Sequence, residues 1–93
     1  MPQYAISCID RAGALETRLA TRPAHGEYIR SHPGVKLAGP YSNAAGDPVG
    51  SLIIVEADDL AAVQAFCAND PYAKAGVFET VDIRPFKLVI GAL

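Results

Sequence analysis

The sequence has little of what builds crosslinks, metal centres or cofactor sites. Its 93 residues include two cysteines, Cys8 and Cys67, each within an apolar run. Two are too few for a disulfide framework, and neither has the Cys-x-x-Cys or Cys/His spacing of a zinc site. A glycine-rich phosphate loop and a nucleophile elbow are also missing. We therefore expect free thiols in a protein of the reducing cytoplasm, with no metal and no cofactor.

Charge is scarce too. Charged residues make up 19% of the chain, the net charge is −2, and the eight Lys and Arg residues are scattered. This distribution argues against nucleic acid and anionic membranes as partners. No apolar run approaches the ~18 residues that cross a bilayer. Met1-Pro2-Gln3 leads into the first apolar segment without the basic start of a signal peptide, so none is expected.

Apolar residues, in contrast, are abundant at 51% of the chain. A chain of this length forms a single domain, expected over residues 1–93, and buries only roughly 60–68% of its unfolded surface. Part of the apolar excess needs cover, and a subunit interface supplies it. We expect a homodimer or a higher homo-oligomer.

Alternation of apolar residues predicts four strands. They are expected over residues 4–9, 35–41, 50–57 and 79–84. The polar loop 42–48 joins the second and third strands as a hairpin. Pro85 is expected to end the fourth strand, leaving residues 86–90 as a short terminal strand or arm.

Helix signals fall between these strands. Helix formers run from Ala14 to Ala20, and Thr21-Arg22-Pro23 predicts a fresh start and a second short helix that ends by residues 32–34. Another helix is expected over residues 60–67, capped by Asp58 or Asp59. Residues 72–77 are expected to form an irregular or single-turn linker.

The resulting order of elements is typical of one fold class. The order is strand, helix, short helix, strand, strand, helix, strand. This is the split βαβ, or ferredoxin-like, α+β pattern, in which the helices cover one face of an antiparallel sheet. The other face is left bare, although runs such as Leu52-Ile53-Ile54-Val55 are apolar on both faces. A second copy that packs its own sheet against this face, as a barrel-like sandwich, would cover it.

Several short motifs follow one another over nearly the whole chain. They are Arg18-Leu19-x-x-Arg22-Pro23-x-His25, Ala38-Gly39-Pro40, Gly50-Ser51, Asn69-Asp70-Pro71-Tyr72, Gly76-Val77-Phe78 and Arg84-Pro85-Phe86. Together they resemble the YCII-related (YciI-like) family, chiefly because Arg-x-x-His and Asp-Pro-Tyr occur together.

This resemblance implies a fold and a site more than a substrate. It implies a ferredoxin-like subunit of a dimeric α+β barrel, akin to small ring-modifying enzymes of the muconolactone-isomerase type, with an active site at His25 and Asp70. Most members of the family have no established reaction. Gly26 departs from the pattern, since a larger apolar residue such as Leu is expected after the histidine. The glycine either loosens the helix by roughly 1 kcal/mol or opens space beside the imidazole.

His25 and Asp70 are also the pair that the residues themselves single out for proton transfer. Histidine has an ordinary pKa of about 6.5 and exchanges protons near neutral pH. A carboxylate on one ring nitrogen fixes the tautomer and leaves the other nitrogen facing a substrate. The competing interpretation is structural, because Asp before Pro is a common turn former and a histidine at a helix start is often simply exposed.

Four further residues are candidates for substrate binding. Arg18 and Arg22 are four apart, so they share one side if the helical phase is unbroken, and they suit a carboxylate or phenolate. Solvated surface arginines are the alternative. Ser51 offers a hydroxyl at the start of an apolar strand or is an ordinary edge serine, and Tyr72 caps the pocket or merely packs.

Three hypotheses follow. In the first, the protein is a cofactor-free acid–base enzyme of the lyase or isomerase type, with His25 and Asp70 catalytic and a small cyclic or anionic metabolite as substrate. In the second, the same pocket binds a small molecule without transforming it. In the third, the chain is a structural dimer module in which the two side chains never meet.

Overall fold

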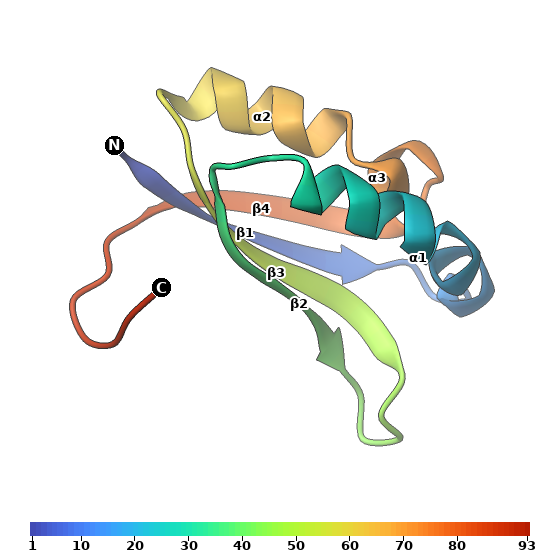
Figure 1. The fold of residues 1–93 in the computed structure, drawn as a ribbon. Helices are drawn as coiled ribbons and strands as arrows, with labels where there is room; N and C mark the ends of the chain where they lie inside the picture. Colours follow the sequence, from blue (N-terminus) through green and yellow to red (C-terminus); the bar gives the residue numbers. More distant parts are fainter.

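A computed structural model describes residues 1–93 of the chain, which form four strands and three helices. In chain order these are β1 (Gln3–Asp10), α1 (Leu15–Arg30), β2 (Val35–Ser42), β3 (Pro48–Glu56), α2 (Leu60–Ala68), α3 (Pro71–Lys74) and β4 (Phe78–Phe86). The strands form one antiparallel sheet in the order β2-β3-β1-β4. All three helices lie on one face of it (Figure 1). The ferredoxin-like α+β fold expected from the order of elements is confirmed.

The core lies between the helices and the sheet, and it follows the alternation of β1. Tyr4, Ile6 and Cys8 are buried toward the helices. Ile6 is paired with Ile53 of β3 on one side and with Ile83 of β4 on the other. Opposed residues of an antiparallel pair share a face, so the three strands present one apolar surface to the helices. The remaining core residues from outside β1 are Ile53, Val55, Val63, Phe66, Tyr72, Val77 and Phe78.

One helix, α1, replaces the two that were predicted before the hairpin. It runs without a break from Leu15 to Arg30 with Pro23 inside, so the predicted fresh start is wrong. Proline in a helix interior removes one backbone hydrogen bond and costs about 3 kcal/mol. Pro23 is on the exposed side of α1, whereas Arg18 is buried and Tyr28 and Ile29 pack against the core. Packing along the whole length of α1 therefore outweighs the local signal to restart.

The short helix that the chain does contain is α3, within the segment expected to be a single-turn or irregular linker. Pro71 occupies its first turn and the Asp70 side chain caps it. In α2, Asp59 is the N-cap, and its Oδ1 accepts a hydrogen bond of 2.9 Å from the Ala62 backbone N–H. Of the two aspartates that were candidates for this cap, the second is therefore the one used.

Strand β4 continues through Pro85, contrary to the expectation that this proline ends it. The strand lies at the edge of the sheet and pairs only with β1. A proline is tolerated there because a backbone N–H that points out of the sheet has no partner to lose. No terminal strand follows, and residues 87–93 leave the sheet as an arm (Figure 1).

The second face of the sheet carries no helix (Figure 1). The register places Ile9, Leu37 and Leu52 on this face, and Ile9 and Leu37 are exposed. On the same face the hydroxyl groups of Ser7 and Tyr41 form a hydrogen bond of 2.9 Å.

No helix of the structure combines the length and apolar character needed to cross a bilayer.

Candidate functional site

A cleft of about 480 Å³ opens between α1 and the strands β2 and β3. Its walls are α1, with seven residues, the helix-facing side of the hairpin, and the ring of Tyr72 from α3. The residues of α1 that line it are Arg18, Leu19, Arg22, His25, Gly26, Ile29 and Arg30. These positions recur at intervals of three and four, so one continuous stripe of α1 faces the cleft. The unbroken helix therefore brings the candidate arginines and the candidate histidine to the same wall.

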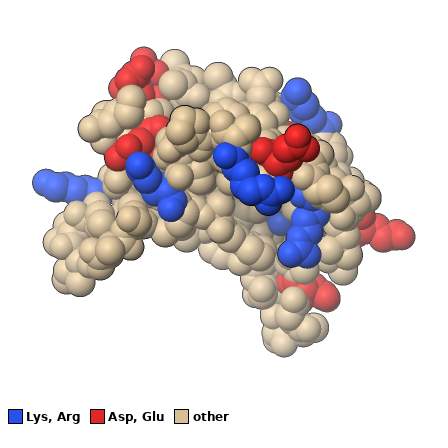
Figure 2. All heavy atoms as spheres, viewed as in Figure 1, with Lys and Arg blue, Asp and Glu red and all other residues tan.

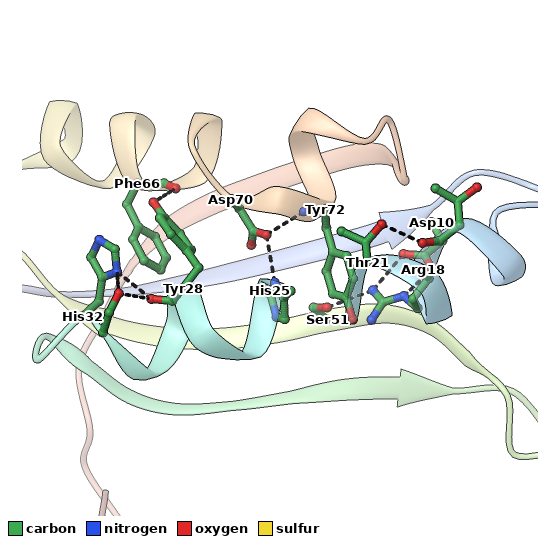
Figure 3. A network of polar contacts seen from close by, with 12 residues as sticks. Asp10, Arg18, Thr21, His25, Tyr28, His32, Ser51, Phe66, Asp70 and Tyr72 are labelled. Atoms are coloured by element: carbon green, nitrogen blue, oxygen red, sulfur yellow. Dashed lines mark hydrogen bonds and ion pairs between the residues drawn. The ribbon is translucent and has the colours of Figure 1, made fainter. Parts of the chain in front are cut away.

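His25 and Asp70 meet at this wall (Figure 3). The Nδ1 of His25 lies 2.8 Å from Oδ1 of Asp70, although 45 residues separate them in the chain. The His25 and Asp70 side chains are only 14% and 4% exposed, respectively. The premise of the third hypothesis, that the two side chains never meet, is therefore wrong.

Asp70 also caps α3, so one side chain both forms the turn before Pro71 and contacts His25. Its Oδ1 accepts a second hydrogen bond of 2.8 Å from the Tyr72 backbone N–H. As a carboxylate, Asp70 can only accept hydrogen bonds, so the Nδ1 of His25 must carry a proton. In a neutral imidazole the lone pair then lies on Nε2. The helix cap thus fixes the carboxylate, and the carboxylate fixes the tautomer.

Tyr72 packs against one face of the His25 imidazole, whereas Asp70 contacts a ring nitrogen. Its ring stacks on the ring of His25, with centroids 3.9 Å apart and planes 15° apart. The Cζ of Arg18 lies 4.4 Å from the centroid of the Tyr72 ring. In Figure 3 the side chain of Tyr72 lies between those of His25 and Arg18. Burial raises the pKa of the Tyr72 hydroxyl, although Arg18 and Arg22 act to lower it, so the phenol keeps its proton near neutral pH.

Arg18 is the most firmly anchored cation of the site. Its Nε and Nη2 donate to Oδ2 and Oδ1 of Asp10 at 2.6 and 2.9 Å, and Nη2 also donates to Oγ of Ser51 at 2.9 Å. Arg18 is only 3% exposed. Burial acts to lower its pKa, but the hydrogen bond and the charge of Asp10 raise it, so the guanidinium stays charged.

The sequence-predicted binding residues all border the cleft, in different ways. Arg18, Ser51 and Tyr72 are buried in its wall, whereas Arg22 is exposed and takes part in no ion pair. The predicted shared side of Arg18 and Arg22 is confirmed, because both line the cleft. Two positions that the sequence did not point to are Asp10, which ends β1 and neutralises Arg18, and Arg30, which extends the stripe of α1. Gly26, expected to loosen the helix or to open space beside the imidazole, also lines the cleft.

The two cysteines are free and lie outside the lining of the cleft. Burial, with smaller contributions from nearby charges, raises the pKa of Cys8 to about 12 and that of Cys67 to about 11. Thiols with such pKa values are poor nucleophiles near neutral pH. No three His, Cys, Asp or Glu side chains lie together as a metal site would need.

The fold and the site together define a class of protein. The chain matches the YCII-related domain over residues 2–87, and it belongs to that family. Among its relatives, Protein YciI of Escherichia coli O6:H1 is 39% identical over 95 residues, which cover 92% of this chain and 97% of that protein. An uncharacterised protein of Haemophilus influenzae is 34% identical over 97 residues, with the same coverage.

Solved structures add a relative with a stated activity. The 5-chloro-2-hydroxyhydroquinone dehydrochlorinase TftG of Burkholderia phenoliruptrix AC1100, in complex with 2,5-dihydroxybenzoquinone, is similar with a TM-score of 0.87 and 31% identity over 91% of this chain and 93% of its own. An antibiotic biosynthesis monooxygenase is similar in fold, with a TM-score of 0.59 and 17% identity over 97% of this chain and 100% of its own. These neighbours are dimeric α+β barrel proteins.

Proposed function

We propose that this protein is a cofactor-independent acid–base enzyme of the lyase or isomerase type, acting on a small hydroxylated ring compound. The observation that carries the proposal is the 2.8 Å contact of His25 and Asp70 at the wall of the cleft. The similarity to a dehydrochlorinase that binds a dihydroxybenzoquinone supports the substrate class. A cytoplasmic location stays a prediction from the free thiols.

In this mechanism His25 is the general base and then the general acid. Its Nε2 takes a proton from a ring carbon or ring hydroxyl of the substrate, and Asp70 stabilises the imidazolium that forms. In an elimination, the electron pair left behind forms a new double bond while the leaving group departs with its own pair. In an isomerisation, the imidazolium returns the proton to a different carbon. Either route needs no redox partner, because the substrate's own electrons are only rearranged.

The remaining site residues bind and position the ring. Ser51 accepts a hydrogen bond from Arg18, so its own hydroxyl proton is free to donate to a substrate oxygen. Arg22 is an exposed cation at the cleft and suits a phenolate or carboxylate oxygen. Arg18, whose charge Asp10 neutralises, takes part through Ser51 and Tyr72, which it holds in place.

We further propose that the protein is a homodimer. The bare face of the sheet exposes Ile9 and Leu37, and the chain's structural neighbours are dimeric α+β barrels. A second copy that packs its bare face against the first would remove this surface from water. Size-exclusion chromatography with light scattering tests the stoichiometry, and a monomer at micromolar concentration would contradict it.

The test of the function uses the two compounds known for the dehydrochlorinase. Chloride release from 5-chloro-2-hydroxyhydroquinone is followed for the wild type and for His25→Ala, which should lose roughly 10²- to 10⁴-fold in kcat/KM, the usual contribution of general acid–base catalysis. His32→Gln is the matched control, because His32 is the other histidine and does not line the cleft.

Two outcomes would count against the proposal. Turnover that survives His25→Ala would contradict the role of the dyad. A wild type that neither turns over the chlorinated compound nor binds 2,5-dihydroxybenzoquinone would contradict the substrate class. A rise in melting temperature with 2,5-dihydroxybenzoquinone, without turnover, would instead favour the second hypothesis, a binding protein.

A further inference from the structure

The cleft carries an excess of positive charge. Three arginines line it, Arg18, Arg22 and Arg30, and no Asp or Glu does. Asp10 neutralises Arg18 from behind, but neither Arg22 nor Arg30 forms an ion pair. Figure 2 shows basic side chains gathered over α1, with an acidic group above them in this view. Two cations that form no ion pair therefore border the cleft on the same helix as His25.

The guanidinium of Arg30 lies next to Gly26, where there is space for it because residue 26 has no side chain. A Cβ built on Gly26 would lie 3.2 Å from Nη1, 3.4 Å from Nη2 and 3.6 Å from Cζ of Arg30. The guanidinium therefore leans back by one helical turn and lies against the backbone of the residue that follows His25. Long side chains on a helix point in this direction, toward the N-terminus. A leucine at position 26 would occupy the space that the guanidinium fills.

We propose that Arg30, seated over Gly26, forms with Arg22 a two-cation subsite that selects ring substrates carrying a carboxylate. Residues 22 and 26 are one turn of α1 apart, about 6 Å along the axis, with His25 between them in sequence. A carboxylate on the ring is held by the guanidinium groups through paired, charge-assisted hydrogen bonds. The rest of the ring is then held beside the Nε2 of His25. This inference rests on the proposed function for its reaction, but the selectivity itself is a property of binding.

Two probes that differ only by the carboxylate test the subsite. The dissociation constants of 2,5-dihydroxybenzoate and 1,4-dihydroxybenzene are measured by calorimetry or NMR titration. We expect the wild type to bind the carboxylate compound at least about tenfold more tightly, and this preference to fall as ionic strength rises. In Arg30→Gln the preference should fall to less than about threefold, because one of the two cations is removed.

Position 26 supplies the second, independent pair of variants. Gly26→Leu displaces the guanidinium without removing its charge and should lower the preference as Arg30→Gln does. Gly26→Ala asks Arg30 to move by only a few tenths of an ångström, so it should keep the preference. Arg11→Gln is the charge control, because Arg11 is exposed, forms no ion pair and does not line the cleft.

The results separate this inference from the proposed function. Equal binding of the two probes by the wild type would overturn the subsite, and so would a preference that survives both Arg30→Gln and Gly26→Leu. His25→Ala should lose turnover but keep the preference for the carboxylate. Turnover by His25→Ala would overturn the dyad and leave the subsite standing. Circular dichroism and melting curves confirm that each variant is folded before its binding is interpreted.

Discussion

Replacing Asp10 by alanine tests how much the buried ion pair with Arg18 contributes to stability. The carboxylate accepts two hydrogen bonds from the guanidinium, at 2.6 and 2.9 Å, and the two side chains are 6% and 3% exposed. In Asp10→Ala the Arg18 charge stays buried with Ser51 as its one remaining hydrogen-bond partner among side chains. An uncompensated buried charge is far more costly than a lost surface contact.

The size of the effect follows from this burial. Removing one partner of a buried pair costs about 3–5 kcal/mol, a large part of the roughly 5–15 kcal/mol by which a domain is stable. For a domain of this length each kilocalorie lowers Tm by roughly 4–8 °C, so we expect a fall of at least about 12 °C. Removing both charges, in Asp10→Ala/Arg18→Met, should cost less than the two single changes added together, because no charge is then left unpaired.

The assay is urea unfolding followed by circular dichroism, at one fixed protein concentration because dimerisation would add to the apparent stability. A second ion pair in the chain provides the control. Arg84 Nε and Asp82 Oδ2 are 2.7 Å apart, almost the distance in the buried pair, but their side chains are 77% and 52% exposed. Asp82→Ala should leave the unfolding midpoint nearly unchanged, because many surface pairs contribute nothing measurable.

If Asp10→Ala lowers the free energy of unfolding by no more than Asp82→Ala does, an uncompensated buried charge is not the cause of the loss. The same holds if the double variant is as unstable as the sum of the single changes, since the loss would then come from packing and not from an unpaired charge. The two pairs differ in burial and in the number of hydrogen bonds, two against one, so a difference between them reports the combined effect of both.

Two further predictions concern positions away from the cleft. Because burial raises the pKa of Cys67 to about 11, two units above its ordinary value of 9.0, iodoacetamide near neutral pH should alkylate it about a hundredfold more slowly than an ordinary thiol. The rate should rise as pH approaches 11 or when urea exposes the thiol, and mass spectrometry that found rapid alkylation of the native protein would contradict this. Asp59→Ala should lower the free energy of unfolding by about 1 kcal/mol, because it removes the cap of α2. Asp58→Ala, which removes no capping bond, should change little in the same urea titration, and equal losses would show that the cap is not the cause.

Much of the fold could be predicted because strand signals are local. The alternation of β1 and the turn residues of the hairpin place the strands to within about two residues. The two errors both concern proline. Pro23 and Pro85 each break a hydrogen-bond pattern locally, but one lies on the exposed side of a helix that packs along its length, and the other lies in an edge strand. Which side of an element a proline occupies depends on tertiary packing, which the local sequence does not contain.

The site was predictable in part because the spacing of residues along a helix is also a local signal. The spacing of Arg18, Arg22 and His25 is a helical pattern, and it was correct once the helix proved continuous. Arg30 continues this spacing, but whether its guanidinium lies over Gly26 depends on the side-chain rotamer, which the sequence does not specify. The partner of Arg18 was missed because Asp10 belongs to the end of a strand and meets α1 only across the turn that joins them.

Tyr72 joins the two polar networks of the molecule, and this gives the Asp10 variant a second consequence. One face of its ring stacks on His25, and the guanidinium of Arg18, which Asp10 holds, packs against the ring as well. A cation over an aromatic ring contributes about 0.5–2 kcal/mol when its position is fixed, and it is the carboxylate that fixes it. Asp10→Ala should therefore lower kcat of the proposed reaction as well as stability, although Asp10 does not line the cleft. The kcat of Asp10→Ala has to be measured well below the Tm of this variant. An unchanged kcat would show that Asp70 alone positions the imidazole.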